Sequence, residues 1–305
     1  MSRPVARKGI ANGEIIGPSS RAEHAFVTLL TTDSFGPGAQ VLLHSLRTSI
    51  SAKDKDVAIR PVVVVLVTPE ISERTRKGLE GFCDELLTVE PIANPYAENS
   101  HVSGWVDSGF TKLQIWGLTQ FERVVYLDAD CLVVEDIQEL FSADVDFAAA
   151  PDIFPPDRFN AGVMLVRPNL DVYEDMLRAV EAGALPSYDG GDTGFLNAFF
   201  PKWYSSPLVR TGSTSSSFST CGGKTMPQKV SMARLPFIWN AQRTLHWMTH
   251  AVAPGYWGAV ATHVKILHFS SSPKPWEPEG VRKKGELEVK WWTTFVEMHM
   301  AKNVT

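Results

Sequence analysis

Two aspartates separated by one residue, Asp128 and Asp130, directly follow the apolar run at residues 123–127. Where the backbone turns at the end of a strand, two such carboxylates can both reach one hard divalent cation. Oxygen ligands suit Mn²⁺ or Mg²⁺, and an ion held in this way can bridge to a diphosphate. A solvated turn that holds two acidic residues is the alternative explanation, because Asp-x-Asp is a short pattern.

A second acidic pattern, Asp-Gly-Gly-Asp-Thr-Gly, occupies residues 189–194. Its paired glycines let the backbone approach a ligand closely, and the carboxylates of Asp189 and Asp192 can accept hydrogen bonds from sugar hydroxyl groups. Asp192 could instead be the N-cap of a helix that begins near Thr193. The two roles are compatible with each other.

His268 and Lys274 form a third group, in the segments LHF and KPW. An imidazole at the end of an apolar strand could complete a metal site, and a nearby lysine could neutralise phosphate charge. A lone histidine is more often structural, so this pattern is weak by itself. Dinucleotide binding of the Rossmann type is not predicted, because the turn at residues 36–39 lacks the Gly-x-Gly-x-x-Gly pattern.

Strands that end at one edge of a sheet are needed to bring these groups together. The β-branched run at residues 61–67 is typical of a parallel strand that is covered on both faces. Strands and helices alternate along the chain, which predicts a doubly wound α/β fold that binds ligands beyond the carboxyl ends of its strands. The other predicted elements are strands over 25–30, 85–89, 123–127, 147–150 and 162–166, and helices over 37–50, 71–83, 111–121, 171–182 and after residue 192.

The composition of the 305-residue chain is that of a globular protein, with a formal net charge of −5 that argues against nucleic acid as the main partner. Three cysteines without CxxC spacing leave one unpaired, which favours a reducing compartment. The first residues lack the apolar core of a signal peptide, and the uncharged stretch 244–264 is interrupted by Pro254. The sequence therefore predicts a cytoplasmic protein without a membrane partner.

Three regions follow from these patterns: a disordered arm over residues 1–23, one domain over 24–280, and a C-terminal helix within 281–305. Residues 205–233 are rich in Ser, Thr and Gly and are predicted to be a long loop that serves as a lid or binds an acceptor. The C-terminal segment carries Trp291 and Trp292 at near-helical spacing with other apolar residues. We expect it to pack on the domain or to form a dimer interface.

Six segments, in order, resemble family 8 of the retaining glycosyltransferases, and within it the glycogenin-like members. The resemblance runs from about residue 25 to residue 276. The segments are FVTLLTTDSFGPGA, TKLQIWGLTQFERVVYLDADCLV, AAPD followed by FNAGVMLVRP, YDGGDTGFLN, LPFIWN and HFSSSPKPW. Each is a weak match alone, but their common order favours the functional explanation of every pattern described above.

The resemblance implies a GT-A fold, a single α/β domain with a mostly parallel sheet that binds a UDP-hexose and Mn²⁺, or Mg²⁺. It implies that Asp128, Asp130 and His268 are the metal ligands, and that Ala129 between the aspartates lies against the donor. The remaining donor-binding residues that it implies are Leu29, Thr31, Thr32 and Phe35 around uridine, Lys112 and Lys274 on the phosphates or the sugar side of the donor, Asp152, Asn160, Ala161, Asp189, Asp192 and Thr193 around the hexose, and Ser271.

The resemblance also implies a reaction that retains the anomeric configuration. Breaking the anomeric bond places negative charge on UDP, which a cation and Lys274 would stabilise. A double displacement needs a carboxylate beneath the anomeric carbon, for which Asp189 and Asp192 are the candidates. A front-face substitution needs none, because the departing phosphate deprotonates the acceptor hydroxyl, and we favour this route.

The sequence departs from the glycogenin pattern at the acceptor. Glycogenins glucosylate a tyrosine of their own chain, and Trp247 occupies the aligned position here, where an indole has no hydroxyl to accept a sugar. Thr193 replaces a glutamine and Ser271 a glycine, and the 205–233 loop is enlarged. The pattern is similar to that of the glycogenin-like α-galactosyltransferases of protists, which extend a glycan on the Skp subunit of cullin-type ubiquitin ligases.

We therefore expect transfer of a hexose, galactose rather than glucose, to a glucose-terminated glycan on a protein, by a homodimer. Two alternatives stay open. One is a glycogenin-type enzyme that uses UDP-glucose to prime a glucan. The other is an inactive scaffold that binds a UDP-sugar, although every metal and donor position named above is filled in this sequence.

Overall fold

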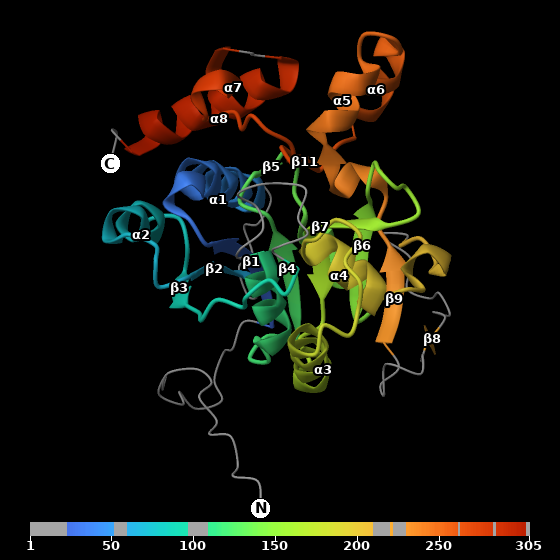
Figure 1. Cartoon of the computed structure of the whole chain (residues 1–305). Helices are drawn as coiled ribbons and strands as arrows, with labels where there is room; N and C mark the ends of the chain where they lie inside the picture. The colour runs from blue at the N-terminus through green and yellow to red at the C-terminus, as the bar shows by residue number, and fades with distance from the viewer. Residues whose placement is uncertain are drawn as a thin grey trace, which may run out of the picture.

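A computed structural model of the chain describes residues 23–51, 60–96, 109–209, 220–221, 230–261, 263–282 and 285–302. An eight-stranded sheet in the order β3-β2-β1-β4-β7-β6-β9-β8 forms its centre (Figure 1). Its strands are β1 (His24–Leu30), β2 (Val62–Val67), β3 (Glu85–Thr88), β4 (Arg123–Leu127), β6 (Phe147–Pro151), β7 (Phe159–Val166), β8 (Thr220–Cys221) and β9 (Val230–Arg234).

Parallel pairing dominates the sheet. β3, β2, β1 and β4 are parallel neighbours, and β6 pairs with β9 in parallel. β7 is antiparallel to both β4 and β6, and β8 is antiparallel to β9. The prediction of an α/β domain with a mostly parallel central sheet is confirmed.

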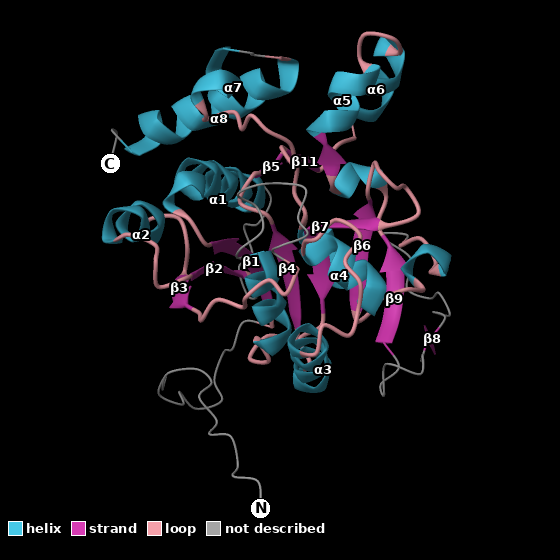
Figure 2. Cartoon of the chain, viewed as in Figure 1, coloured by secondary structure: helices cyan, strands magenta, loops and turns pink. Residues whose placement is uncertain are grey.

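Helices cover both faces of this sheet, because its strands are apolar on both sides. One core contains side chains of α1, β5, β11 and α8, and the other those of the 3-10 helix η3, α3 and α4. Figure 2 shows α1, α2 and α8 on one side of the strands and α3 on the other. The helices are α1 (Gly36–Ser51), α2 (Glu73–Glu80), η3 (Gly109–Gly117), α3 (Leu170–Glu181), α4 (Asp192–Phe199), α5 (Arg243–Thr249), α6 (Pro254–Ala261), α7 (Pro278–Arg282) and α8 (Glu286–Lys302).

A second sheet of three short strands lies beside the carboxyl end of β4. Its order is β10 (Ala241–Gln242), β11 (Ile266–His268) and β5 (Cys131–Val133). β11 runs antiparallel to β5, so that His268 is the register partner of Cys131. This pairing places a residue from the last quarter of the chain next to the Asp-x-Asp segment.

Two predicted elements differ from the structure. The helix predicted over 111–121 is a 3-10 helix, η3, that already ends at Gly117. The loop predicted over 205–233 is wrong at its end, because β9 pairs there with β6 and brings Met232 and Ala233 into the cores. Residues 210–219 and 222–229 of that loop, and residues 1–22 of the predicted arm, lie outside the described residues.

The C-terminal helix α8 packs against the domain through Leu287, Trp291 and Met298, which belong to the same core as α1. Helices α5 and α6 lie next to it at the same end of the molecule (Figure 1). Across the described residues, helices that are both long and apolar enough to cross a bilayer are absent.

Candidate active site

Strand β4 ends at Leu127 and delivers Asp128 and Asp130 at its carboxyl end. The backbone turns immediately, since the N–H of Cys131 donates to the carbonyl of Asp128 at 2.9 Å. Asp128 N–H also donates to the carbonyl of Gly162 in β7, which fixes the turn against the sheet. The two carboxylates therefore point from one rigid strand end, and Asp130 is only 4% exposed.

His268 meets both carboxylates. Its Nε2 atom lies 3.2 Å from Oδ1 of Asp130 and 3.8 Å from Oδ2 of Asp128. Ligand atoms of Asp130, Cys131 and His268 lie within 4.8 Å of one another. Burial raises the pKa of the Cys131 thiol, which disfavours the thiolate that binds metals. Without Cys131, the possible ligands are the carboxylates of Asp128 and Asp130 and the imidazole of His268. This set fits a hard divalent cation such as Mn²⁺.

The orientation of the His268 ring is set by neighbours that the sequence alone did not reveal. Nδ1 of His268 lies 2.8 Å from Oδ1 of Asn240, and the Asn240 amide donates to Oδ1 of Asn160 at 3.0 Å. A second-sphere partner of this kind fixes the tautomer and the angle of a ligating imidazole. A Cβ atom at Gly162 would overlap Cε1 of His268, so this close approach requires glycine.

Lys274 lies on the opposite side of Asp130. Its Nζ atom is 2.6 Å from Oδ2 of Asp130 and donates to the carbonyl of Phe269 at 2.8 Å. Burial alone would raise the pKa of the Asp130 carboxyl, but Lys274 and His268 hold it well below its usual range. Asp130 is therefore an anion at neutral pH, with a cation already beside it.

Lys112, on the 3-10 helix η3, connects the two acidic patterns. Its Nζ atom lies 3.0 Å from Oδ1 of Asp128 and 2.7 Å from Oδ2 of Asp192, and it donates to the carbonyl of Ala161 at 3.3 Å. Burial by itself lowers the pKa of Lys112, but the two carboxylates raise it above the usual range. The hydroxyl of Tyr126, which the sequence did not single out, donates to Oδ1 of Asp128 at 2.8 Å.

The Asp189–Asp192 loop divides its two carboxylates between different tasks. Oδ1 of Asp189 accepts from the hydroxyl of Ser187 and from the N–H groups of Gly191 and Gly194, at 2.8, 2.9 and 2.9 Å. This oxygen holds the loop together. The N-cap of α4 is Gly191 and Asp192 is its first residue, so the N-cap role considered for Asp192 is wrong. The Asp192 side chain turns to Lys112 instead.

The predicted uridine-binding residues lie at the end of β1 and directly after it. Leu29 is in the strand, Thr31 and Thr32 come directly after it, and Phe35 ends the 3-10 helix η1 (Asp33–Phe35). The centroid of the Phe35 ring lies 5.6 Å from Nζ of Lys274. The turn that is predicted to bind the nucleotide therefore lies close to the carboxylate cluster.

The predicted hexose residues lie around the ends of β6 and β7. The N–H of Ala161 donates to the Thr193 hydroxyl at 3.4 Å, which joins β7 to α4. Burial raises the pKa of Asp152, which directly follows β6, and backbone donation from Ile153 to its Oδ1 opposes the shift. Burial also raises the pKa of the Tyr188 hydroxyl, and the charges of Asp152 and Asp189 raise it further.

Ser271 has a different setting from the rest of the predicted set. Nη2 of Arg243 donates to both the carbonyl and the hydroxyl of Ser271, the latter at 3.0 Å. Trp247 packs over the same guanidinium, with its ring centroid 4.0 Å from Cζ of Arg243. The residue that replaces the expected acceptor tyrosine thus covers a buried arginine, a role that the sequence did not suggest.

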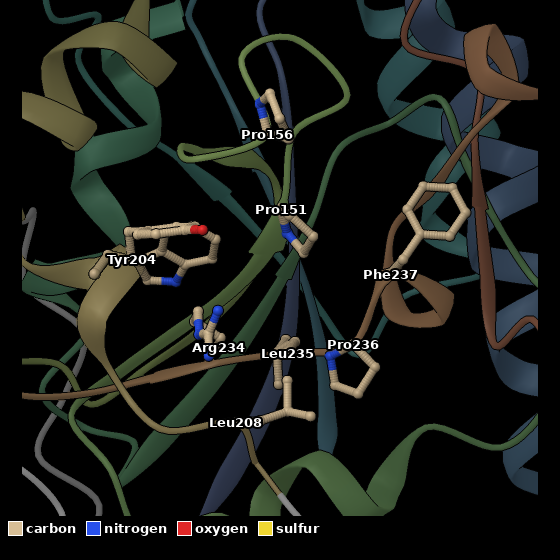
Figure 3. A pocket seen from close by; sticks show the side chains of 9 residues that line it. Pro151, Pro156, Tyr204, Leu208, Arg234, Leu235, Pro236 and Phe237 are labelled. Carbon is tan, nitrogen blue, oxygen red and sulfur yellow. The ribbon is translucent and has the colours of Figure 1, made fainter. Parts of the chain in front are cut away.

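Two cavities lie beyond the end of β6. One, of about 180 Å³, has Tyr204 and Arg234 on one side and Pro236 and Phe237 on the other (Figure 3). A second, of about 270 Å³, is lined by Tyr188, Arg158 and other residues and shares Trp203 and Tyr204 with the first. The buried indole N–H of Trp203 has no hydrogen-bond partner among the described residues. The exposed rings of Tyr188 and Tyr204 suit a ligand with apolar faces.

Comparison with known proteins places this geometry in a family. The protein-family model described as Glycosyl transferase family 8 matches residues 26–280 of the sequence. This range includes every site residue described above. The chain belongs to glycosyl transferase family 8. The resemblance found in the sequence is confirmed at this level.

Among relatives of this family 8 chain, Glycogenin-1 of Caenorhabditis elegans is 36% identical over 270 residues, covering 88% of the chain and 54% of the relative. Human Glycogenin-1 is 31% identical over 290 residues, covering 90% and 72%. Inositol phosphorylceramide glucuronosyltransferase 1 of Arabidopsis thaliana is 31% identical over 286 residues, covering 93% and 45%. The chain thus spans about half the length of the nematode relative.

Solved structures share the fold of the family 8 chain. The galactosyltransferase LgtC, in complex with donor and acceptor sugar analogs, superimposes with a TM-score of 0.59 at 19% identity, over 90% of this chain and 95% of that one. The glycosyltransferase GlyE of Streptococcus pneumoniae gives 0.57 at 18% identity, over 89% and 60%. These neighbours agree with the predicted GT-A architecture.

Proposed function

We propose that this protein is a retaining, Mn²⁺-dependent glycosyltransferase that moves a hexose from a UDP-sugar to a glucose-terminated glycan on a protein. One observation carries the proposal. Asp128, Asp130 and His268 converge at the end of β4, with Lys112 on one side and Lys274 on the other. A cation site flanked by two buried amines is what a diphosphate leaving group requires.

The residues of the chain have separable tasks in this proposal. Asp128, Asp130 and His268 would hold the metal, which when bound supplies positive charge to the diphosphate. Lys274 lies at the same place and would stabilise the charge that develops on departing UDP. Lys112 would keep Asp128 and Asp192 oriented. Asp130, His268, Lys112 and Lys274 are buried, which makes their charges more effective than they would be in water.

We propose a front-face substitution, in which the departing phosphate takes the proton of the acceptor hydroxyl. The contacts of the two candidate nucleophiles support this route. One oxygen of Asp189 is saturated by three donors of its own loop, and Oδ2 of Asp192 is paired with Lys112. A covalent glycosyl adduct trapped on either residue would contradict it.

The acceptor would occupy the cavities around Tyr204. Tyr204 is 55% exposed, and its ring centroid lies 5.6 Å from Cζ of Arg234, which braces it from one side. Pro151 lines the first cavity and directly precedes Asp152, so the cavity lies next to one of the predicted hexose-binding residues. We prefer a separate acceptor because Trp247, which has no hydroxyl group, stands where glycogenins carry their acceptor tyrosine.

Galactose is proposed as the transferred sugar, as in the protist enzymes that modify the Skp subunit. The choice of galactose rests on the resemblance to these enzymes and on Thr193, which replaces a glutamine of the glycogenins. We also propose that the enzyme is a cytoplasmic homodimer, which sedimentation of the purified chain would test. A monomer at micromolar concentration would contradict the homodimer.

The experiment that tests the activity measures hydrolysis of UDP-galactose and UDP-glucose with MnCl₂, then transfer to a panel of glucosides. We expect UDP-galactose to be consumed faster and the rate to depend on Mn²⁺. The matched control is Asp128→Asn, which keeps the shape of the side chain and removes a ligand charge. Inactivity towards both donors would overturn the enzyme proposal and favour the inactive scaffold.

A glycogenin-type enzyme is the second candidate, because several relatives bear that name. Incubation of the chain with UDP-glucose and no acceptor tests it by intact mass. We expect no added hexose. A mass increase that maps to Tyr256, which is 45% exposed, or to another tyrosine would favour this candidate.

A further inference from the structure

The segment 271–277 connects the two halves of the proposed donor site. Lys274 reaches Asp130, and Nε1 of Trp276 donates to the carbonyl of Ser34 at 2.9 Å in the turn after β1. The Trp276 ring also packs edge to face on Phe35, with the centroids 5.7 Å apart. Gly38 allows this packing, since a Cβ atom there would overlap the Trp276 ring.

The segment is braced from behind by α8. The rings of Trp276 and Trp291 have centroids 5.5 Å apart, and Nε1 of Trp292 donates to the carbonyl of Pro275 at 3.1 Å. The two tryptophans of α8 therefore contact the two residues that directly follow Lys274 in its segment.

A buried ion pair supplies the second brace. Arg243, 1% exposed, donates through Nη2 to Ser271 at the start of the segment, and its Nη1 lies 3.2 Å from Oε1 of Glu288 in α8. The other carboxylate oxygen of Glu288 accepts from the N–H of Gly285 at 3.1 Å, the return half of a capping box. One carboxylate thus fixes the start of α8 and the guanidinium together.

Stability alone does not explain this pair. Two charges that are almost fully buried cost desolvation energy that their attraction barely offsets, and apolar residues of similar size are often as stable or more so. A guanidinium, unlike an apolar side chain, presents donors in a fixed fork. Here the guanidinium holds Ser271 and Glu288 at a fixed distance from each other, so the pair positions the segment that begins at Ser271 relative to α8.

We propose that Arg243, Glu288, Trp291 and Trp292 form a splint that positions Lys274 for the diphosphate of the donor. We call this set the α8 splint. Arg243 is a positioning residue that acts through Lys274 and Trp276 and does not touch the donor. The inference rests on the proposed function, because it assigns a purpose to the loop that carries Lys274.

A double-mutant cycle on the full chain tests the splint, with UDP binding measured by titration calorimetry in MnCl₂. We expect Arg243→Met to weaken UDP binding about tenfold, as loss of a second-sphere partner does. In the Lys274→Met background the same substitution should change the affinity less than twofold, since its effect passes through Lys274. Additive effects of the two substitutions would overturn the proposal, as would unchanged affinity in Arg243→Met.

Two further variants separate positioning from folding. Trp292→Phe keeps an aromatic ring against Trp291 and Phe295 and removes the donor to Pro275. It should also weaken UDP binding while the melting temperature stays within a few degrees. Arg47→Met is the matched control, because Arg47 pairs with Asp84 at 2.8 Å between α1 and the residue before β3. It should lower the melting temperature and leave UDP affinity unchanged; a tenfold loss there would contradict the splint.

The wild-type titration distinguishes the two levels of the argument. If the wild-type chain does not bind UDP in the presence of Mn²⁺, the proposed function fails. If the wild type binds UDP and Arg243→Met binds it equally well, the proposed donor site stands and only the splint fails.

Discussion

The amine of Lys112 lies 2.7 Å from a carboxylate oxygen of Asp192, although 80 residues separate them in the sequence. One partner comes from η3, before β4, and the other from the first turn of α4. The same amine lies 3.0 Å from Asp128. A single buried cation therefore ties a carboxylate of the proposed metal site to the loop of the proposed hexose site.

Replacing Lys112 with methionine leaves Asp128 and Asp192 without their shared cation. Removing one partner of a buried pair is strongly destabilising, so we expect the free energy of unfolding to fall by about 3 kcal/mol. Urea denaturation measures this change. Hydrolysis of the UDP-sugar should fall as well, because both carboxylates lose their orientation.

Mn²⁺ should restore part of the stability of this variant, since a cation that binds only the folded state stabilises it by mass action. Lys112→Arg, which keeps the charge, is the control and should lose less. Equal stability of the methionine variant and the wild type would show that the pair is not the connection we describe.

Asn240 should control metal affinity without touching the metal. Asn240→Ala removes the partner of Nδ1 of His268, so the ring loses its fixed tautomer and angle. We expect Mn²⁺ affinity to fall about 10- to 100-fold, the usual effect of losing such a partner. The Mn²⁺ dependence of hydrolysis measures it, and an unchanged half-saturating concentration would refute the role.

We expect the buried carboxylate of Asp152 to lower the stability of the protein at neutral pH while it contributes to activity. Because burial raises its pKa, the folded state holds the proton more tightly than the unfolded chain does. The free energy of unfolding therefore decreases as pH rises from the ordinary carboxyl pKa of about 4 through the raised value. Asp152→Asn removes this titration and still accepts from the N–H of Ile153.

We expect Asp152→Asn to melt at a higher temperature than the wild type at pH 7, and the difference to shrink at acidic pH. Transfer should decrease, since the residue faces the proposed hexose site. Thermal melts across pH give the result directly. A lower melting temperature for the variant at pH 7 would contradict the direction of the pKa shift.

Tyr204 should affect the acceptor and not the donor. Tyr204→Ala removes the exposed ring of the cavity, and we expect the KM for a glucoside acceptor to rise about tenfold, equivalent to about 1.4 kcal/mol of binding. Hydrolysis of the UDP-sugar in the absence of acceptor should be unchanged. Leu170→Ala, at an exposed apolar residue of α3, is the surface control.

The sheet and the Asp-x-Asp turn could be predicted from the sequence because their signals are local. The apolar run at 123–127 became β4 with the same bounds, and the run at 61–67 became β2, one residue shorter. Short, continuous apolar runs rich in β-branched residues are typical of strands that are buried on both faces. The positions of Asp128 and Asp130 at a strand end followed directly.

The parts that were missed depend on contacts between distant segments. Strands β5 and β10 have three and two residues, too few to show a period. β9 lies in a stretch rich in polar residues and is fixed by its pairing with β6. Asn240 ends the LPFIWN segment, yet no role was predicted for it or for Arg243, because only the folded chain brings their side chains to His268 and Ser271. The site roles of all these residues remain predictions.

The pairing of His268 with Cys131 across β11 and β5 has a consequence for biosynthesis. Asp130 leaves the ribosome far ahead of His268, and the α8 residues that brace Lys274 emerge later still. A nascent or prematurely terminated chain that stops before His268 lacks one of the three proposed metal donors and also Lys274, the second amine of the proposed phosphate site. Such a chain cannot complete the proposed donor site, so we expect it not to compete for the cell's pool of nucleotide sugars.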